Sequence, residues 1–210
     1  MKKNSIAIIA ILLFMVWQPA DLLAQERGLN VWAIGIGAGS TDFKEAVQGE
    51  SDDLWNSWSL TFARQNYRIK LDKPFSLGLF TGSQLDIIFP NSFEFKPYDD
   101  VLILPRIAAD LLQVGLAGGF QILNGVNVVA HAGVGGSIVA TTTQWDEFNM
   151  SYFGYGITPT VGARVVLSES ITLGLGIRFG EVDTTLYFDG DKVGDTFKTD
   201  MKGYYLTVSF

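Results

Sequence analysis

The chain has a single histidine, His131, and no cysteine, so few of its side chains could carry out acid–base or nucleophilic chemistry. A histidine that acts as a general base needs a nucleophile and an orienting carboxylate within hydrogen-bonding reach. Ser137 lies further along the same expected strand, roughly 20 Å away at the usual rise per residue. Because this separation is too large for a catalytic pair, we predict no catalytic residue. His131 is interpreted as a buried, hydrogen-bonded polar side chain opposite Ala117.

Two arginines, Arg164 and Arg178, lie on the polar rows of neighbouring expected strands. Charges enclosed in an interior of low dielectric must be paired with one another or with acids. The sequence therefore predicts structural ion pairs, with the selectivity filter of a small channel as the alternative. The predicted polar network of the interior consists of Gln113, Asn127, His131, Arg164 and Arg178, and the side chains expected to face inward with it are Arg68, Lys70, Gln84 and Asp86.

Two further motifs suggest ligand binding but lack the required spacing. The glycines of Gly35-Ile36-Gly37-Ala38-Gly39 alternate strictly and no helix is expected after them, which is typical of a strand with a glycine face rather than of a dinucleotide loop. Asp189, Asp191 and Asp195 could hold calcium, but the terminal glutamate and the spacing of a calcium-binding loop are missing. We predict an Asp-Gly hairpin turn there. No metal or cofactor site is expected.

Period-two alternation of apolar with small or polar residues indicates eight strands that could position these side chains. They are expected near 29–39, 55–71, 75–89, 101–122, 126–141, 151–167, 171–182 and 197–210. Matching the apolar rows of neighbouring strands predicts three three-residue turns, Asp72-Lys73-Pro74, Leu123-Asn124-Gly125 and Ser168-Glu169-Ser170. The other connections are long, roughly 40–54, 90–100, 142–150 and 183–196, and the first and last are acidic.

The chemistry of the two faces distinguishes a membrane barrel from a soluble one. One row of each strand carries large apolar residues such as Trp32, Leu77 and Ile177, and the opposite row carries mainly glycine, serine and threonine. Small polar residues fit a narrow lumen, and large apolar residues fit lipid. Short turns at one end, long loops at the other and both termini at the short-turn end complete the pattern. The predicted fold is all-β, an eight-stranded antiparallel transmembrane β-barrel.

The alternation is interrupted in two places. In the second strand the apolar row shifts by one position between Phe62 and Tyr67, which predicts a β-bulge near residues 63–66. In the fourth strand Pro105 and a slip near residues 110–112 predict an irregular upper half. Residues 106–111 could also form a helical turn.

Aromatic residues gather at both ends of the expected strands, as in the girdles at the two interfaces of a membrane barrel. Those toward the long loops are Trp55, Trp58, Phe89, Trp145, Tyr152 and Phe153, and those toward the short turns are Trp32, Phe75, Phe120 and Phe210.

The first 24 residues have a basic start, an apolar run over 6–16 and a short polar tail, the pattern of a cleavable signal peptide. Cleavage after Ala24, with Ala20 as the alternative, divides the chain into a signal peptide, 1–24, and one barrel domain, 25–210. The whole chain has a net charge of −7, and removal of Lys2, Lys3 and Asp21 leaves about −8. An acidic protein is poorly suited to nucleic acid.

The C-terminal strand ends in an aromatic residue that follows alternating apolar positions, Tyr204, Leu206, Val208 and Phe210. Together with the signal peptide and the strand rhythm, this end resembles the assembly signal of small eight-stranded outer-membrane barrels of the OmpA/OmpX type in Gram-negative bacteria. The resemblance implies an integral outer-membrane protein with periplasmic termini. It also implies contact with membrane lipid and lipopolysaccharide, and recognition of the last strand by the barrel-assembly machinery.

The resemblance implies a structural or surface-contact role without catalysis, through loops whose partner the sequence does not identify. A narrow, porin-like channel for small solutes is the first alternative. A lipid A-modifying barrel enzyme is the second, and it is disfavoured because it needs a histidine near a serine at the outer rim, whereas His131 is expected in mid-barrel.

Overall fold

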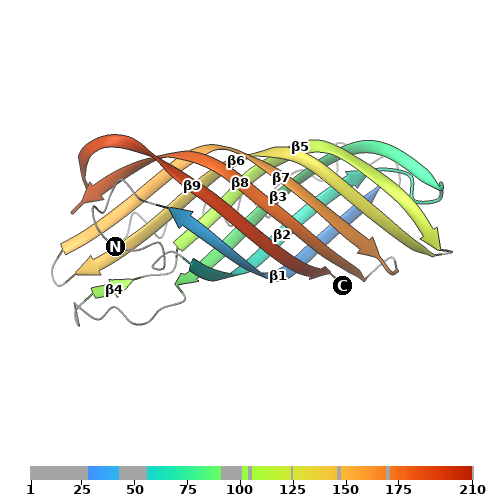
Figure 1. The fold of residues 1–210 in the computed structure, drawn as a ribbon, viewed down its shortest axis with the longest axis horizontal. Helices are drawn as coiled ribbons and strands as arrows, with labels where there is room; N and C mark the ends of the chain where they lie inside the picture. The colour runs from blue at the N-terminus through green and yellow to red at the C-terminus, as the bar shows by residue number, and fades with distance from the viewer. Residues whose placement is uncertain are drawn as a thin grey trace.

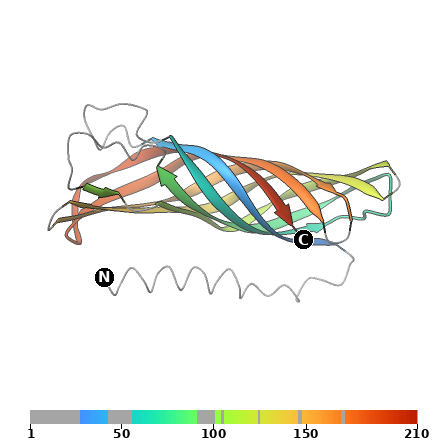
Figure 2. The same ribbon diagram turned by 90° about the horizontal axis from the view of Figure 1, so that it is seen from below.

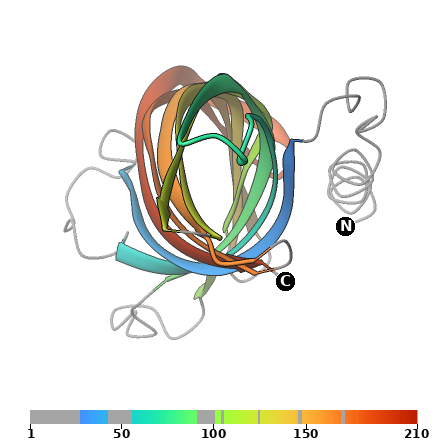
Figure 3. The ribbon, with the colours of Figure 1, turned by 90° about the vertical axis from the view of Figure 1, so that its right-hand side faces the viewer.

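Eight long antiparallel strands form a closed ring (Figures 1 and 3). The computed structural model describes residues 28–42, 56–90, 101–103, 106–123, 125–145, 148–168 and 171–209. The ring consists of β1 (Leu29–Asp42), β2 (Asn56–Arg68), β3 (Phe75–Pro90), β5 (Arg106–Leu123), β6 (Val126–Trp145), β7 (Phe148–Val166), β8 (Thr172–Phe188) and β9 (Asp191–Ser209). A short strand, β4 (Val101–Ile103), pairs with the end of β6 that is farthest from the short turns. The predicted all-β barrel is confirmed.

The pairing of β1 with β9 closes the ring and fixes its dimensions. Stepping from partner to partner leads from Gly39 once around the ring to Leu29, ten residues lower on β1, through Gly203, Arg178, Thr160, Gly133, Gly115, Phe80 and Tyr67. With eight strands, this stagger corresponds to a strand tilt of about 40°. Figure 2 shows the strands running obliquely to the long axis of the barrel. A ring of this size encloses a space that side chains can fill completely.

The apolar rows face outward. Along β8, Thr172, Gly174, Gly176 and Arg178 are buried, whereas the alternating Leu173, Leu175, Ile177 and Phe179 are exposed. On other strands Leu77 is 73% exposed and Ile157 is 72% exposed. A continuous apolar exterior of this kind suits the hydrocarbon of a bilayer rather than water. In the described part of the chain, no helix is long and apolar enough to cross a membrane.

The short turns follow the predictions in part. Leu167 N donates a hydrogen bond to Ile171 O at 3.0 Å, so these two residues face each other as predicted. Gly125 adopts the expected positive φ, +87°, but Leu123 rather than Ile122 pairs with Val126, because a bulge lies between Gln121 and Leu123.

The prediction for the β2–β3 turn is wrong. Arg68 pairs with Leu79, a register that places Leu71 opposite Ser76, and Leu71 packs against the interior instead of facing outward.

The predicted bulge in the second strand is also wrong. The pairing of β2 with β1 and with β3 runs without a shift from residue 57 to residue 67. Tyr67 and Ile69, 1% and 3% exposed, belong to the interior, and Arg68 and Lys70 face outward rather than inward. The apolar residues of β2 change from the outward row to the inward row because the interior is also apolar near the short turns.

The fourth predicted strand is divided into β4 and β5. The slip near residues 110–112 is confirmed, since the register shifts between Asp110 and Leu112 against β6 and at the matching place against β3. Residues 106–111 form a strand and not the helical turn considered as an alternative.

Two of the predicted long loops are extended hairpins. β6 and β7 stay paired from residue 127 to residue 145, and β8 and β9 up to Phe188 and Asp191. Asp189 and Gly190 both have positive φ, +48° and +94°, which confirms the predicted Asp-Gly turn. The predicted signal peptide, the loops at 43–55 and 91–100, Trp55 and Phe210 lie outside the described residues.

Candidate functional site

The interior of the barrel is divided into apolar and polar layers. Near the short turns, Leu29, Val31, Tyr67, Ile69, Phe80 and Val129 belong to one apolar cluster. Toward the opposite end, Ile88, Ala108, Val139, Tyr152, Val182 and Met201 form a second. Asp86, Asp110 and Arg178 lie between these clusters, whereas Arg164 and Gln65 lie beside Val129 and Tyr67 of the first cluster. The barrel interior is therefore built like a protein core.

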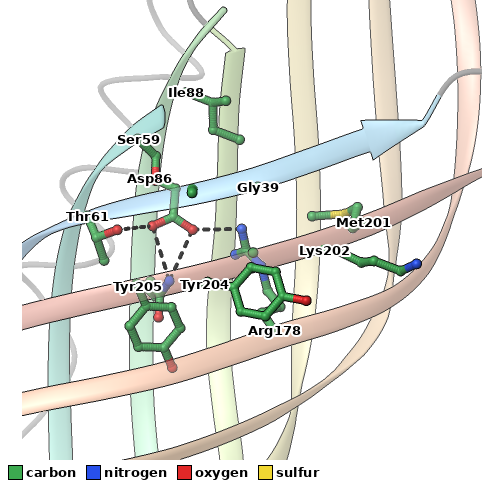
Figure 4. A pocket seen from close by; sticks show the side chains of 13 residues that line it. Gly39, Ser59, Thr61, Asp86, Ile88, Arg178, Met201, Lys202, Tyr204 and Tyr205 are labelled. Atoms are coloured by element: carbon green, nitrogen blue, oxygen red, sulfur yellow. Dashed lines mark hydrogen bonds and ion pairs between the residues drawn. The ribbon is translucent and has the colours of Figure 1, made fainter. Parts of the chain in front are cut away.

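A buried cluster of three charges, Asp86, Asp110 and Arg178, lies between the two apolar clusters. Figure 4 shows the contact between two of them, Asp86 and Arg178. Arg178 Nη2 contacts Asp86 Oδ2 at 2.6 Å, and Arg178 Nη1 contacts Asp110 Oδ1 at 3.3 Å. The three side chains come from β8, β3 and β5, and none of these residues is more than 5% exposed. The arginine thus links strands that are not neighbours in the ring.

Neutral donors satisfy the remaining oxygen atoms of the two carboxylates. Thr61 Oγ1 donates to Asp86 at 2.7 Å, and Gln84 Nε2 donates to both Asp86 oxygens at 3.0 and 3.1 Å. Gln113 Nε2 donates to Asp110 at 2.7 Å, and Ser137 is also hydrogen-bonded to Asp110. A buried ionic cluster is tolerated only when its hydrogen-bonding groups are satisfied in this way.

A second polar cluster surrounds Arg164. Its guanidinium donates to Thr172 Oγ1 at 2.5 Å, Gln65 Oε1 at 2.7 Å and Thr207 Oγ1 at 3.2 Å. Tyr67 donates to the same Gln65 oxygen at 2.8 Å. Hydroxyl and amide oxygens therefore hold this arginine, without a carboxylate.

His131 lies at the edge of the second cluster and pairs with Ala117 as predicted. Its Nδ1 is 3.2 Å from the Tyr67 hydroxyl, and its ring stacks on Phe80 with centroids 4.1 Å apart. Ser137 is engaged instead with Asp110 and Thr158. The geometry therefore does not bring Ser137 to the histidine.

The other predicted interior residues divide into two groups. Gln113, Arg164 and Arg178 are buried inside the ring, but Asn127 is only half-buried and its Oδ1 has no hydrogen-bond partner within the described ranges. Sequence reasoning missed Gln65 and Asp110. Continuing the strict alternation of β2 through residues 63–69 would have placed Gln65 inside.

The space left beside the charged cluster is small. A cavity of about 20 Å³ is lined by Ser59, Asp86, Arg178, Met201 and Tyr205, among others. That volume holds about one water molecule. Together with the two apolar clusters, it leaves no wide path through the described part of the lumen.

The predicted aromatic girdles are largely present on the exterior. Trp58 stacks on Phe89 at 4.3 Å toward the loop end, and Phe75 lies 5.1 Å from Phe120 toward the turn end. Tyr152 is a correction, because it is 6% exposed and packs in the interior cluster near the loops. On the predicted assembly strand, Tyr204 and Leu206 face outward, 56% and 57% exposed.

A paired sheet extends beyond the ring at the end opposite the short turns (Figure 1). β9 pairs with β1 only up to Asp200, so the segment from Asp191 to Thr199 pairs with β8 alone among the described residues. Lys198 bonds Asp183 at 2.7 Å on this exposed surface, and that hydrogen bond raises the pKa of Lys198 above its ordinary value. We refer to residues 184–199 as the projecting hairpin.

No protein-family model matches the chain, and no curated protein does. Among solved structures, Ail, the attachment invasion locus protein of Yersinia pestis, aligns with a TM-score of 0.50 over 88% of this chain and 98% of that chain, at 9% sequence identity. Omp33, an outer membrane protein of Acinetobacter baumannii, covers 88% of this chain and 100% of its own, with 11% identity and a TM-score of 0.15. The first likeness shows the fold, an eight-stranded barrel of the outer-membrane type.

Proposed function

We propose that the protein is a non-enzymatic integral protein of a bacterial outer membrane that contacts a partner at the cell surface through the projecting hairpin. The observation that carries this proposal is the outer edge of β9 from Asp191 to Thr199, to which no strand of the described residues is paired. An edge strand offers a row of backbone donors and acceptors to which another chain can add a strand.

The side chains of the hairpin fit a contact surface. Phe188 and Val193 are 38% and 43% exposed beyond the ring, and Lys192 and Lys198 alternate with acidic residues there. Exposed apolar side chains surrounded by charges are typical of protein-binding surfaces. The likeness to a protein whose name refers to attachment and invasion agrees with this role.

The proposal also assigns an orientation. In bacterial barrels the short turns face the periplasm and the longer connections face outward. The short β2–β3, β5–β6 and β7–β8 connections and both chain ends are then periplasmic, and the hairpin lies outside the cell. The outward rows contact lipid and lipopolysaccharide, and the last strand, Tyr204 to Phe210, carries the signal for the barrel-assembly machinery.

Adhesion of bacteria that express the full chain to a cultured epithelial monolayer tests the surface role. A variant lacking residues 186–188 and 191–193 keeps the Asp189-Gly190 turn but shortens the open edge. Adhesion is expected to fall to the level of cells without the protein. The matched control, Phe188→Ser with Val193→Thr, keeps the backbone edge and should retain part of the adhesion.

Barrel integrity in both variants is checked by the heat-dependent change in gel mobility. Adhesion by the shortened variant equal to that of the intact chain would rule out the hairpin as the contact surface. An enzymatic role in lipid A modification would be revealed by a changed lipid A mass spectrum on overexpression, and none is expected, because Ser137 and His131 are engaged with different partners.

A further inference from the structure

The pairing of β7 with β8 is interrupted in the middle of the wall. On the side of the projecting hairpin the ladder ends where Tyr155 pairs with Asp183, and it resumes where Thr160 pairs with Arg178. The register is the same on both sides, so no residue is inserted. Both strands are described throughout this region, and the ladder pairs are missing over residues 156–159 and 179–182, which we call the unpaired stretch.

The residues of the unpaired stretch explain the interruption. Pro159 has no N–H group, and proline is normally excluded from strands that have a neighbour on each side. Gly180 has a φ of +145°, a conformation that residues with a side chain rarely adopt. A Cβ atom on Gly180 would lie 3.3 Å from Pro159 Cδ, so the two residues are adjacent across the seam.

The interruption is confined to this one seam. Pro159 still pairs with Val134 on β6, and Gly180 still pairs with Met201 on β9. Each of the two strands is therefore held on its other side, and only the contact between them lacks its ladder.

The unpaired stretch lies at the outer edge of the apolar band. Ile157 and Phe179 are 72% and 43% exposed on its outward face. Asp183, the first paired residue beyond it, binds Lys198 on the exposed surface of the projecting hairpin. In hydrocarbon, backbone groups without a partner are tolerated only where they are buried in protein or reach water. At this level of the wall, water of the outer interface is close.

A chain of polar groups leads from the unpaired stretch to the buried charges. Thr158 faces inward and is 0% exposed, and its hydroxyl is hydrogen-bonded to Ser137. Ser137 is also hydrogen-bonded to Asp110, which contacts Arg178 at 3.3 Å. The interior side of the seam is thus connected to the charged cluster by hydrogen bonds.

The seam is closed in the structure. A Cβ atom on Gly156 would lie 2.9 Å from Glu181 O, so the two strands remain in contact, and water can reach Thr158 only if they separate locally. Local opening is easiest where no ladder hydrogen bonds have to be broken.

We propose that the unpaired stretch is a lateral entrance in the barrel wall. It opens transiently and lets water of the outer interface reach Thr158 and, through Ser137, Asp110. This inference depends on the membrane placement proposed above and not on the surface contact of the projecting hairpin.

Cysteine labelling of the full chain tests the entrance, because the chain has no cysteine of its own. Thr158→Cys in lipid vesicles is treated with the water-soluble thiol reagent aminoethyl methanethiosulfonate. The matched control is Thr61→Cys, since Thr61 is also 0% exposed and lies at the charged cluster, but β2 is paired there without a break on both sides. Thr158→Cys is expected to react about tenfold or more faster than the control.

A second substitution closes the entrance without touching the labelled residue. Pro159→Val supplies the missing N–H group, and it is expected to slow the labelling of Thr158→Cys to the rate of the control. Equal rates at the two cysteines in the parent chain, or an unchanged rate after Pro159→Val, would overturn the proposal.

Hydrogen exchange of the unmodified chain supplies the test if the cysteine variants do not fold. The amides of residues 179–182 that point toward β7 must exchange about tenfold or more faster than those of residues 173–177, which lie in the paired part of β8. Equally slow exchange would show that the seam does not open. These outcomes are independent of adhesion, because residues 184–199 are unchanged.

Discussion

Arg178 is placed where its loss would leave two buried carboxylates without a cation. Asp86 and Asp110 are 5% and 0% exposed, and their other partners are neutral hydroxyl and amide groups. Removing one member of a buried ionic cluster usually costs more than the cluster contributes when intact, because the remaining charges stay desolvated.

Arg178→Ala is therefore expected to lower the free energy of unfolding by about 3–5 kcal/mol. Urea unfolding in lipid vesicles, followed by tryptophan fluorescence, measures the change. Lys198→Ala is the control, because the Lys198–Asp183 pair is exposed and solvent screens such pairs, so its loss should change the stability little. Similar losses for the two variants would show that the buried cluster is not a structural support.

The residues of the polar interior could be predicted only where the alternation was unambiguous. Arg164 and Arg178 follow long regular rows and lie inside as expected. Asp110, the second acid that contacts Arg178, lies at a bulge, where the strict alternation of inward and outward residues fails. Hydrogen-bond partners such as Gln65 depend on the three-dimensional meeting of β2 and β7, which no local pattern encodes.

At the scale of the element, β9 serves both as the closing strand of the ring and as the edge of the projecting hairpin. The half of β9 nearest the short turns pairs with both β1 and β8. Its outward residues Tyr204 and Leu206 are more than half exposed. These side chains have no protein covering, so lipid must supply their surroundings if the barrel spans a bilayer.

Leu206→Arg is expected to destabilise the inserted barrel by about 2–4 kcal/mol, the cost of a lipid-facing cation near the bilayer midplane. Urea titration of the vesicle-inserted protein gives the difference from wild type. Val193→Arg, on the same strand but beyond the ring, should change the stability by less than about 0.5 kcal/mol. An equally small effect at Leu206 would contradict a transmembrane position for this row.

The strands differ in how well the sequence predicts them. In the half of β8 nearest the short turns, apolar and small or polar residues alternate strictly, and the apolar row faces outward as predicted. β2 was misinterpreted because Tyr67 and Ile69 belong to an interior that is apolar near the turns, while Arg68 and Lys70 are outside. The hairpins that replace two expected loops contain many polar residues, so their sequences resemble loops, but cross-strand pairing continues through them and Leu186 and Phe197 pack against the second apolar cluster.

For the whole molecule, the filled interior argues against conduction. Apolar clusters lie on both sides of the charged layer, and the cavity at that layer has room for about one water molecule. An eight-stranded ring is just wide enough for side chains to fill.

The purified full chain is therefore expected to give no stable conductance steps in planar bilayers. Recordings at several voltages, with a general porin inserted under the same conditions as a positive control, provide the measurement. Reproducible steps that change with Arg178→Ala would contradict a closed interior and favour the channel hypothesis.

The outward apolar rows also affect the behaviour of the unfolded chain before it is inserted into a bilayer. A newly made chain exposes long β-prone stretches with oily side chains on alternate positions, and β1 and β9 each have an unsatisfied edge until they meet. Chains that remain in water would pair with one another through these edges instead of closing into a ring. We therefore expect the yield of inserted barrel to depend on a holding chaperone that keeps these rows and edges apart in water.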